Sequence, residues 1–221
     1  MNISRYLRTN RPVVVRNVTL HWEAMKVLDY SWLKAQYTKS EEILQYEANN
    51  CYFKCYKTEE FPTLASVFTM SEERVSDVLS RPWYVGWSVC HKPVFREIEK
   101  LSKTEHLVST FIISLSFPVE IPDFLSELDR MGNMWIFIGS PGYGAHLHLD
   151  DDLELPTWQA QISGAKTWYL RPPPECAGVC KTELQADLHK GDMIIVNTNF
   201  WFHKTLVLDQ GISLVVTQQV G

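Results

Sequence analysis

Residues Gly139 to Asp152 read GSPGYGAHLHLDDD. Within this segment His146, His148, Asp150 and Asp152 occupy every second position. Side chains two residues apart on a β-strand point to the same face, so one face would carry nitrogen and oxygen ligands and the other face would be apolar. Two imidazoles followed by carboxylates are costly to bury without a counter-charge or a metal ion. The segment therefore predicts half of a metal site.

A single strand offers only one adjacent pair of ligands to a metal ion, because side chains two residues apart are separated by about 6.6 Å. Two pairs are open, His148 with Asp150 or His146 with His148. A third ligand, His203, stands in the later segment NFWFHKT. Two histidines and one carboxylate are the ligand set of non-haem Fe(II) oxygenases, whereas three histidines favour zinc or a different cupin metal site.

Length and composition indicate a globular protein. The chain has 221 residues, of which 45% are hydrophobic and 12% aromatic, enough for one sizeable core. The formal net charge of −5 argues against nucleic-acid binding, which needs clustered Lys and Arg, and suits a basic peptide better. No apolar run is long enough to span a membrane, and the amino terminus lacks the apolar region of a signal peptide. We expect an intracellular protein, in the cytoplasm or the nucleus.

The five cysteines are Cys51, Cys55, Cys90, Cys176 and Cys180. An odd number without a compact disulfide framework fits a reducing compartment. The spacing of Cys51 with Cys55, and of Cys176 with Cys180, could each provide half of a zinc site, but such a spacing arises easily by chance. We expect ordinary thiols rather than disulfides or metal ligands.

The expected secondary structure differs between the two parts of the chain, with helices and strands in the first and short strands alone in the second. In the first part we expect helices at 30–37, 63–68, 72–79 and 93–100, and strands at 12–18, 42–47, 52–56 and 83–89. In the second part we expect strands at 133–138, 145–150, 157–162, 166–170, 183–188, 192–196, 201–208 and 212–218. Eight short strands at this spacing predict an antiparallel barrel or jelly roll, buttressed on one sheet by the preceding helices. The chain is expected to form one mainly β domain, with residues 1–130 as a mixed α/β part and residues 131–221 as the barrel core.

The segment 158–174 reads WQAQISGAKTWYLRPPP and predicts a hairpin with Gly164 at its turn. Lys166 follows this turn, where it can point into the barrel and offer one fixed cation to a carboxylate. A lysine at such a position is more often a solvated surface residue. His203 has a similar alternative, since a histidine within an aromatic run can be a core residue with one hydrogen bond.

Taken together, four ordered motifs resemble the jumonji C (JmjC) domain in its cupin-like subgroup of small protein hydroxylases. The motifs are GxGxHxHxD, WQAQIxGxKxWxLxPP, GDMIIV and WFH. The opening segment YLxxNRPVVVRN resembles the start of the same domain, so the resemblance spans nearly the whole chain. It implies a double-stranded β-helix of the jelly-roll or cupin type.

The resemblance further implies an Fe(II)- and 2-oxoglutarate-dependent dioxygenase that uses O2 and releases succinate and CO2. It makes His148, Asp150 and His203 the iron ligands, and Lys166 the partner of the distal carboxylate of 2-oxoglutarate. The implied substrate is a side chain of a protein or peptide, with hydroxylation favoured over demethylation. Three more residues match positions that line the co-substrate pocket in relatives, namely Gln159, Thr217 and Tyr84.

Two departures from the family pattern leave alternatives open. Ala145 stands where a relative has a threonine that provides a hydroxyl for the co-substrate. The additional His146 and a longer acidic segment at 150–155 allow a shift by two residues, which would make His146 and His148 the ligand pair. The rival interpretations are a three-histidine cupin enzyme without 2-oxoglutarate and a catalytically silent binding module. The acidic segment suggests a basic substrate, and residues 121–130 could serve as a homodimer contact.

Overall fold

The structure, a computed structural model, describes residues 10–56, 60–77, 80–102, 134–150, 156–176 and 178–219. The strands are β1 (Val13–Val15), β2 (Phe53–Cys55), β3 (Tyr84–Ser88), β4 (Trp135–Gly139), β5 (Thr157–Ser163), β6 (Ala165–Arg171), β7 (Leu184–His189), β8 (Met193–Val196), β9 (Phe202–Val207) and β10 (Ser213–Gln219). The helices are α2 (Ala24–Val27), α3 (Tyr30–Tyr37), α4 (Glu41–Asn50), α5 (Leu64–Phe68), α6 (Glu72–Ser76), α7 (Lys92–Ser102) and the 3-10 helix η2 (Pro174–Cys176).

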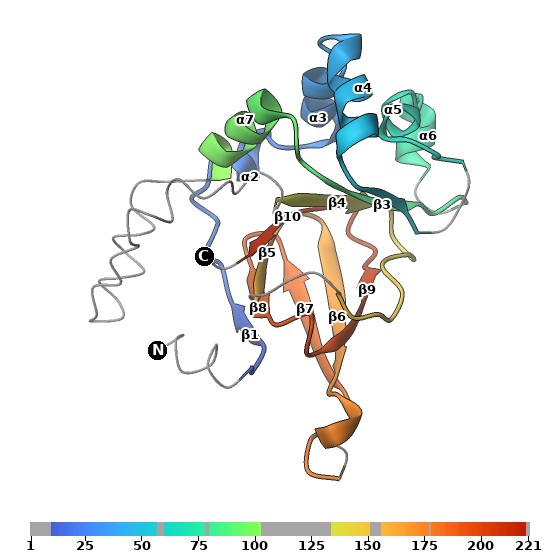
Figure 1. Cartoon of the computed structure of the whole chain (residues 1–221). Coiled ribbons are helices and arrows are strands. Elements are labelled where there is room, and N and C mark those ends of the chain that lie inside the picture. The colour runs from blue at the N-terminus through green and yellow to red at the C-terminus, as the bar shows by residue number, and fades with distance from the viewer. Residues whose placement is uncertain are drawn as a thin grey trace.

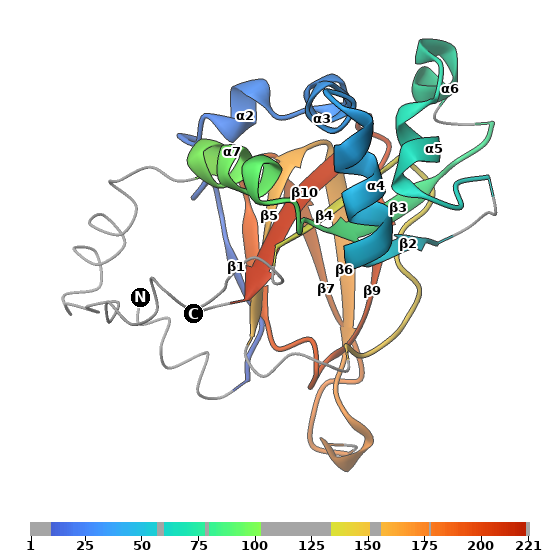
Figure 2. The same ribbon diagram turned by 45° about the horizontal axis from the view of Figure 1, so that its top comes forward.

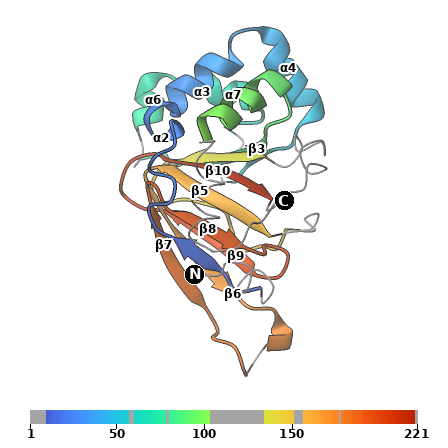
Figure 3. The same cartoon turned by 90° about the vertical axis from the view of Figure 1, so that its left-hand side faces the viewer.

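The strands form two antiparallel sheets. The larger sheet has the order β1-β8-β5-β10-β4-β3-β2, and the smaller has the order β7-β6-β9. Helices α2 to α7 gather in one layer over the larger sheet, and the smaller sheet lies on its other side (Figure 1, Figure 3). With the helices turned towards the viewer, the strands run behind them (Figure 2). The mainly β fold of jelly-roll type, with helical additions from the first part of the chain, is thereby confirmed.

Successive side chains on the strands of the larger sheet point alternately to its two faces. One face packs under the helices and forms the main core, and the other faces the space between the two sheets. On β4, Ile136 and Ile138 are buried in the cluster that the helices share, while Phe137 between them lines a cavity inside the sandwich. The strands β5 and β10 repeat the pattern, with Ala160, Ile162, Leu214 and Val216 in the core under the helices and Gln159 and Thr217 at the cavity. A second cluster packs the smaller sheet against β8 and consists of Trp168, Leu170, Leu188, Ile194, Val196 and Trp201.

The strand expected at 42–47 is wrong, because these residues belong to helix α4. Glu41 and Glu42 lie in the first helical turn, where the helix dipole favours negative charge. Ile43 and Glu47, four residues apart, are both buried on the face that contacts the rest of the protein. Helical spacing of the buried positions therefore overrides the short apolar alternation that suggested a strand.

The strand expected at 145–150 is also wrong as a continuous element. His148 makes only an isolated bridge to His203. The backbone N–H of Thr205 donates to the carbonyl of Ala145 (3.0 Å), and that of His203 donates to the carbonyl of His148 (2.9 Å). Ala145 and His148 are three residues apart, whereas their partners Thr205 and His203 on β9 are two residues apart. The segment that contains Ala145 and His148 therefore has one extra residue, which acts as a β-bulge and interrupts the regular alternation of side chains.

The expectation of ordinary thiols is wrong for four of the five cysteines. Cys51 forms a disulfide with Cys90, and Cys176 forms one with Cys180. Cys51 and Cys90 are 39 residues apart in sequence, and the antiparallel pairing of β2 with β3 brings their Cα atoms to 5.8 Å. Disulfides persist mainly in oxidising compartments, so the expected location in the cytoplasm or nucleus stays a prediction.

Two expectations concern residues that the structure does not describe. One is the dimer contact at residues 121–130, and the other is the acidic segment, of which residues 151–154 are not described. That a single domain covers residues 1–221 also stays a prediction. Among the described helices, none combines the length and the apolar character that a membrane crossing would require.

Candidate metal centre

His148 and His203 face each other across the bridge between the 143–150 segment and β9. Their imidazole rings lie 4.2 Å apart, centroid to centroid. The Nδ1 atom of His148 is 2.6 Å from the carbonyl oxygen of His146, and that of His203 is 3.1 Å from the carbonyl oxygen of Trp201. A carbonyl can only accept, so each Nδ1 carries the proton and each Nε2 keeps a lone pair. Both rings are therefore held in the tautomer that binds a metal through Nε2.

Asp150 completes the group. Its backbone N–H donates to the carbonyl of Thr198 (3.1 Å), which ties the end of the segment to the connection between β8 and β9. Its Oδ1 lies 3.5 Å from Nε2 of His148 and 4.0 Å from Nε2 of His203. All three potential ligand atoms lie within 4.8 Å of one another. Two nitrogens and one oxygen therefore converge on a common point.

The electrostatics of the group suit a divalent cation. Burial lowers the pKa of His203 to about 4, so this imidazole is neutral at pH 7. Burial is the largest influence on Asp150 and opposes its ionisation, but the hydrogen bond with His148 together with contributions from His203 and Thr198 lowers the pKa of the carboxyl below its ordinary value. For His148, burial is again the largest influence and disfavours the charge, but the hydrogen bonds with Asp150 and with the carbonyl of His146, together with the negative charge of Asp150, raise its pKa overall. A charged carboxylate beside imidazoles is the protonation state that metal binding requires.

His146 lies outside this group. Its Nε2 is 3.0 Å from the hydroxyl of Tyr143 and 3.0 Å from the carbonyl oxygen of Tyr56, and its ring packs edge-on against Tyr143. The extra residue before His148 breaks the alternation that would have placed the two histidines on the same face. The geometry therefore supports the pair His148 and Asp150 rather than His146 and His148.

Lys166 on β6 is fully buried, and its Nζ donates a hydrogen bond to the hydroxyl of Tyr84 on β3 (2.6 Å). Burial lowers the pKa of Lys166 to about 7, and burial also raises the pKa of Tyr84. Within the described residues no carboxylate forms an ion pair with this lysine. A buried amine of this kind is suited to an anionic ligand that enters from the cavity.

The three converging residues line a cavity of about 300 Å³ together with Tyr84, Gln159 and Thr217. Lys166 is not part of this lining and contacts it through the hydroxyl of Tyr84. Gln159 is 7% exposed, and its Oε1 has no hydrogen-bond partner among the described residues. The hydroxyl of Thr217 donates to the carbonyl of Trp158 (2.6 Å). Gln159 therefore has free capacity to bind a ligand, whereas the Thr217 proton is already used.

No protein-family model and no curated protein matches the sequence. Among solved structures, the ribosomal oxygenase YcfD from Escherichia coli matches with a TM-score of 0.55 and 15% identity, covering 100% of this chain and 52% of that chain. The chain shares the fold of about half of the YcfD chain. Two further YcfD structures match at the same identity and coverage. The complex with cobalt and 2-oxoglutarate has a TM-score of 0.52, and the complex with cobalt and succinic acid has 0.53.

At this identity the likeness to YcfD shows a shared fold, and that fold agrees with the one that the motifs predict. The chain spans about half the length of the YcfD chains. Its helices and both sheets are covered by the match, since all of this chain is included.

Within the YcfD-like fold, sequence reasoning overlooked several residues of the cavity wall. Trp168 stacks on the ring of His203 with centroids 5.6 Å apart. Its signal was available, because Trp168 stands two residues after Lys166 on the same strand and so shares its face. Trp135 and Phe137, stacked 5.7 Å apart on β4, line the opposite part of the wall. They are likewise two residues apart on one strand, but only the pairing of β4 with β3 shows that this face of β4 points into the cavity.

Proposed function

We propose that the protein is an Fe(II)- and 2-oxoglutarate-dependent dioxygenase that hydroxylates a side chain of a protein or peptide. One observation carries the proposal. His148, Asp150 and His203 place two imidazole nitrogens and one carboxylate oxygen within 4.8 Å of one another, on the wall of a cavity of about 300 Å³. This donor set suits Fe(II) and leaves coordination positions open for a co-substrate and O2.

The three residues would hold the metal through Nε2 of His148, Nε2 of His203 and Oδ1 of Asp150. When bound, iron supplies the oxidising chemistry that couples decarboxylation of 2-oxoglutarate to oxidation of a substrate C–H bond. The chain itself orients the ligands. The carbonyls of His146 and Trp201 fix the two imidazole tautomers, and Trp168 covers one face of His203.

Lys166 and Tyr84 would bind the distal carboxylate of 2-oxoglutarate. The ammonium donates to the tyrosine hydroxyl, and that hydroxyl can donate its own proton to a carboxylate at the cavity wall. The Oε1 of Gln159 has no hydrogen-bond partner among the described residues, so this side chain would provide a further polar contact. Thr217 would contribute mainly shape, because its proton already binds the Trp158 carbonyl.

Ala145 provides no hydroxyl for the co-substrate, but the hydroxyl of a neighbouring residue can take that place. Thr205 also lines the cavity, and its Oγ1 accepts a hydrogen bond from the backbone N–H of Ala145 (3.1 Å). A polar contact for the co-substrate therefore exists at this place in the wall, provided by β9. This weakens the main sequence argument for a catalytically silent binding module.

YcfD is described as a ribosomal oxygenase, and the fold shared with it motivates a protein substrate here. Hydroxylation rather than demethylation, a basic substrate and a homodimer are further proposals. The position of His146, which is held by Tyr143 and Tyr56, argues against a three-histidine metal site.

The experiment measures succinate formed from 2-oxoglutarate by protein that is loaded with Fe(II) without oxygen and then exposed to O2. We expect slow, uncoupled turnover in the wild type and none in His203→Ala. The matched control is His146→Ala, which should retain most of the turnover. Succinate formation that survives Asp150→Ala would contradict the proposed ligand set. A wild type that neither forms succinate nor binds 2-oxoglutarate by calorimetry would favour a binding module.

A further inference from the structure

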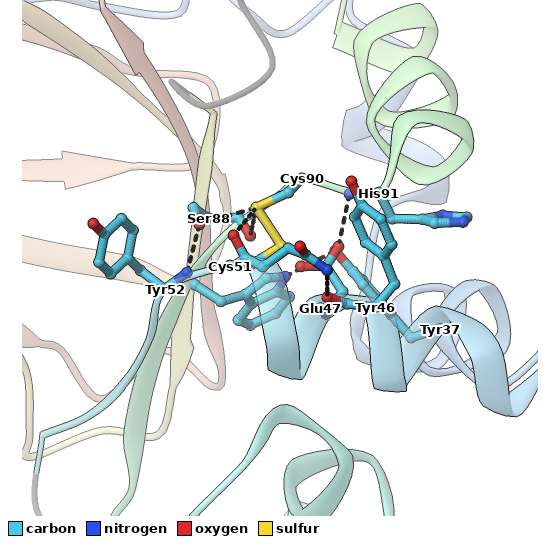
Figure 4. The surroundings of a disulfide bond; sticks show 10 residues. Tyr37, Tyr46, Glu47, Cys51, Tyr52, Ser88, Cys90 and His91 are labelled. Atoms are coloured by element: carbon cyan, nitrogen blue, oxygen red, sulfur yellow. Dashed lines mark hydrogen bonds between the residues drawn. A yellow bond between two sulfur atoms is a disulfide. The ribbon is translucent and has the colours of Figure 1, made fainter.

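A second group of ligand-type side chains lies away from the cavity, where the end of helix α4 meets the loop between β3 and α7. Cys51 follows α4 directly and forms its disulfide with Cys90 in the loop. One carboxylate oxygen of Glu47, in the last turn of α4, lies within 4.8 Å of both sulfur atoms. Figure 4 shows the carboxylate beside the sulfur pair.

The environment of Glu47 lacks a positive charge. The residue is 3% exposed, and its Oε1 accepts a hydrogen bond from the backbone N–H of His91 (3.1 Å). The backbone N–H of Cys90 and the hydroxyl of Tyr37 also hydrogen-bond to this carboxyl group, but among the described residues no cationic side chain neutralises it. The last turn of a helix disfavours negative charge as well. A carboxylate in this position must stay protonated or acquire a cation.

We propose that Glu47, Cys51 and Cys90, once the disulfide is reduced, form a binding site for a thiophilic divalent cation of the zinc class. Two thiolates and one carboxylate are ligands that Zn²⁺ accepts in a tetrahedral site, whereas Mg²⁺ and Ca²⁺ take oxygen ligands. Water or the hydroxyl of Ser88, whose oxygen lies 3.5 Å from the sulfur of Cys90, can complete the coordination.

The redox and proton balance of this site is simple. A thiol or phosphine reductant delivers two electrons to the disulfide, and the two sulfurs take up two protons to become thiols. Binding of the cation to both sulfurs then releases these two protons, and a Glu47 carboxyl that was protonated releases a third when it becomes a ligand. Disulfide and cation use the same sulfur atoms, so they exclude each other. Either state cross-links α4 to the loop that follows β3.

The other disulfide provides an internal comparison. Cys176 is the last residue of η2, and its Cα atom lies 5.4 Å from that of Cys180, but no carboxylate or imidazole among the described residues completes a ligand group with them. Two sulfurs alone bind a divalent cation weakly compared with a three-ligand set. The inference therefore assigns the site to the Cys51 pair.

The experiment titrates Cd²⁺ into the phosphine-reduced full-length chain carrying Cys176→Ser and Cys180→Ser. The ultraviolet thiolate-to-cadmium charge-transfer band detects sulfur ligands only, so binding at His148, Asp150 and His203 adds no signal. One ion bound to sulfur should saturate the band after at most two equivalents are added, because His148, Asp150 and His203 can take up cadmium without contributing signal. Adding Glu47→Gln should keep the amplitude and lower the affinity about tenfold or more, since one ligand is lost. Adding Cys51→Ser should reduce both, whereas Cys55→Ser serves as the matched control and should change neither.

A second measurement needs no substitution. In the reduced wild type, Zn²⁺ should protect Cys51 and Cys90 from alkylation, as read by peptide mass spectrometry, with Cys55 as the internal reference. Equal alkylation with and without Zn²⁺ would overturn the inference even if a variant fails to fold. A band that persists unchanged in Cys51→Ser, or an affinity unaffected by Glu47→Gln, would overturn it as well.

Discussion

His148 and His203 exchange a reciprocal pair of backbone hydrogen bonds, with N–H to carbonyl distances of 3.0 and 2.9 Å. The two imidazoles are therefore positioned by their own peptide groups and not by side-chain packing alone. Their ring centroids lie 4.2 Å apart before any metal is considered. A site preorganised in this way needs little rearrangement to accept a cation.

Removing one of the two neighbouring histidines should separate their roles. His148→Ala is expected to lower the affinity for Co²⁺ by about 100-fold or more, because a direct ligand is lost. His146→Ala should change it by less than about threefold, since this side chain binds Tyr143 and Tyr56 instead. Titration followed by the visible absorption of Co²⁺ measures both. Equal losses in the two variants would contradict the proposed ligand pair.

Gly144 should tolerate no side chain. A Cβ atom added there would lie 2.1 Å from the carbonyl oxygen of Thr205, so the 143–150 segment would have to move away from β9. We expect Gly144→Ala to lower the free energy of unfolding by about 2 to 3 kcal/mol and to weaken metal binding. Urea denaturation and Co²⁺ titration report the two effects.

The control is Gly142→Ala, two residues earlier. A Cβ atom there meets no atom within 4 Å, and only the backbone φ of +81° opposes the change. A cost of about 1 to 2 kcal/mol is expected, with metal affinity unaffected. If both variants bind metal equally well, the close approach to Thr205 does not position the site.

Lys166→Met keeps the length of the buried side chain and removes its charge. Affinity for 2-oxoglutarate should fall by about 100-fold, corresponding to the loss of a charged hydrogen bond of roughly 3 kcal/mol. Pyruvate shares the 2-oxo acid group but has no distal carboxylate, so its weaker affinity should be the same in both proteins. Calorimetry on the Co²⁺-loaded protein measures both ligands. A parallel loss for pyruvate would show that the lysine acts elsewhere.

The affinity for 2-oxoglutarate should also depend on pH. Burial lowers the pKa of Lys166 to about 7, so below pH 7 the ammonium is already charged and can pair with the ligand. Above pH 7 the amine is neutral in the free protein and must take up a proton on binding. Affinity is therefore expected to fall as pH rises from 7 to 9, by at most about tenfold per unit.

Calorimetry in two buffers of different ionisation enthalpy should detect this proton uptake above pH 7. Lys166→Met provides the baseline and should show no such dependence. Pyruvate serves as the second control, because a decline shared by pyruvate would place the pH effect at the metal ligands and contradict its assignment to the lysine.

Local patterns were sufficient to predict much of this fold. The helix expected at 30–37 is present with the same bounds, and Asp29 caps it by accepting a hydrogen bond from the backbone N–H of Trp32 (2.7 Å). The hairpin around Gly164 is present as β5 and β6, and Gly164 has the positive φ of 64° that such a turn favours. In each case the decisive signal lies within a few residues.

The missed features depend on contacts between distant segments. The extra residue before His148 can be recognised only against its partner strand β9, because the alternation of the sequence itself continues through it. The disulfide between Cys51 and Cys90 likewise needs the pairing of β2 with β3, which no local spacing of the cysteines indicates. Helix α4 was missed because its buried positions include a glutamate, which a pattern of apolar residues does not count.

The reciprocal bonds between His148 and His203 also link ligand binding to local opening. To separate the 143–150 segment from β9, both bonds must break and any ion held by the two segments must leave. A bound cation at 1,000 times its Kd would add about 4 kcal/mol to the free energy of that opening. The amide protons of these two histidines should therefore exchange with solvent far more slowly in the metal-loaded protein, which makes their exchange rates a direct gauge of occupancy.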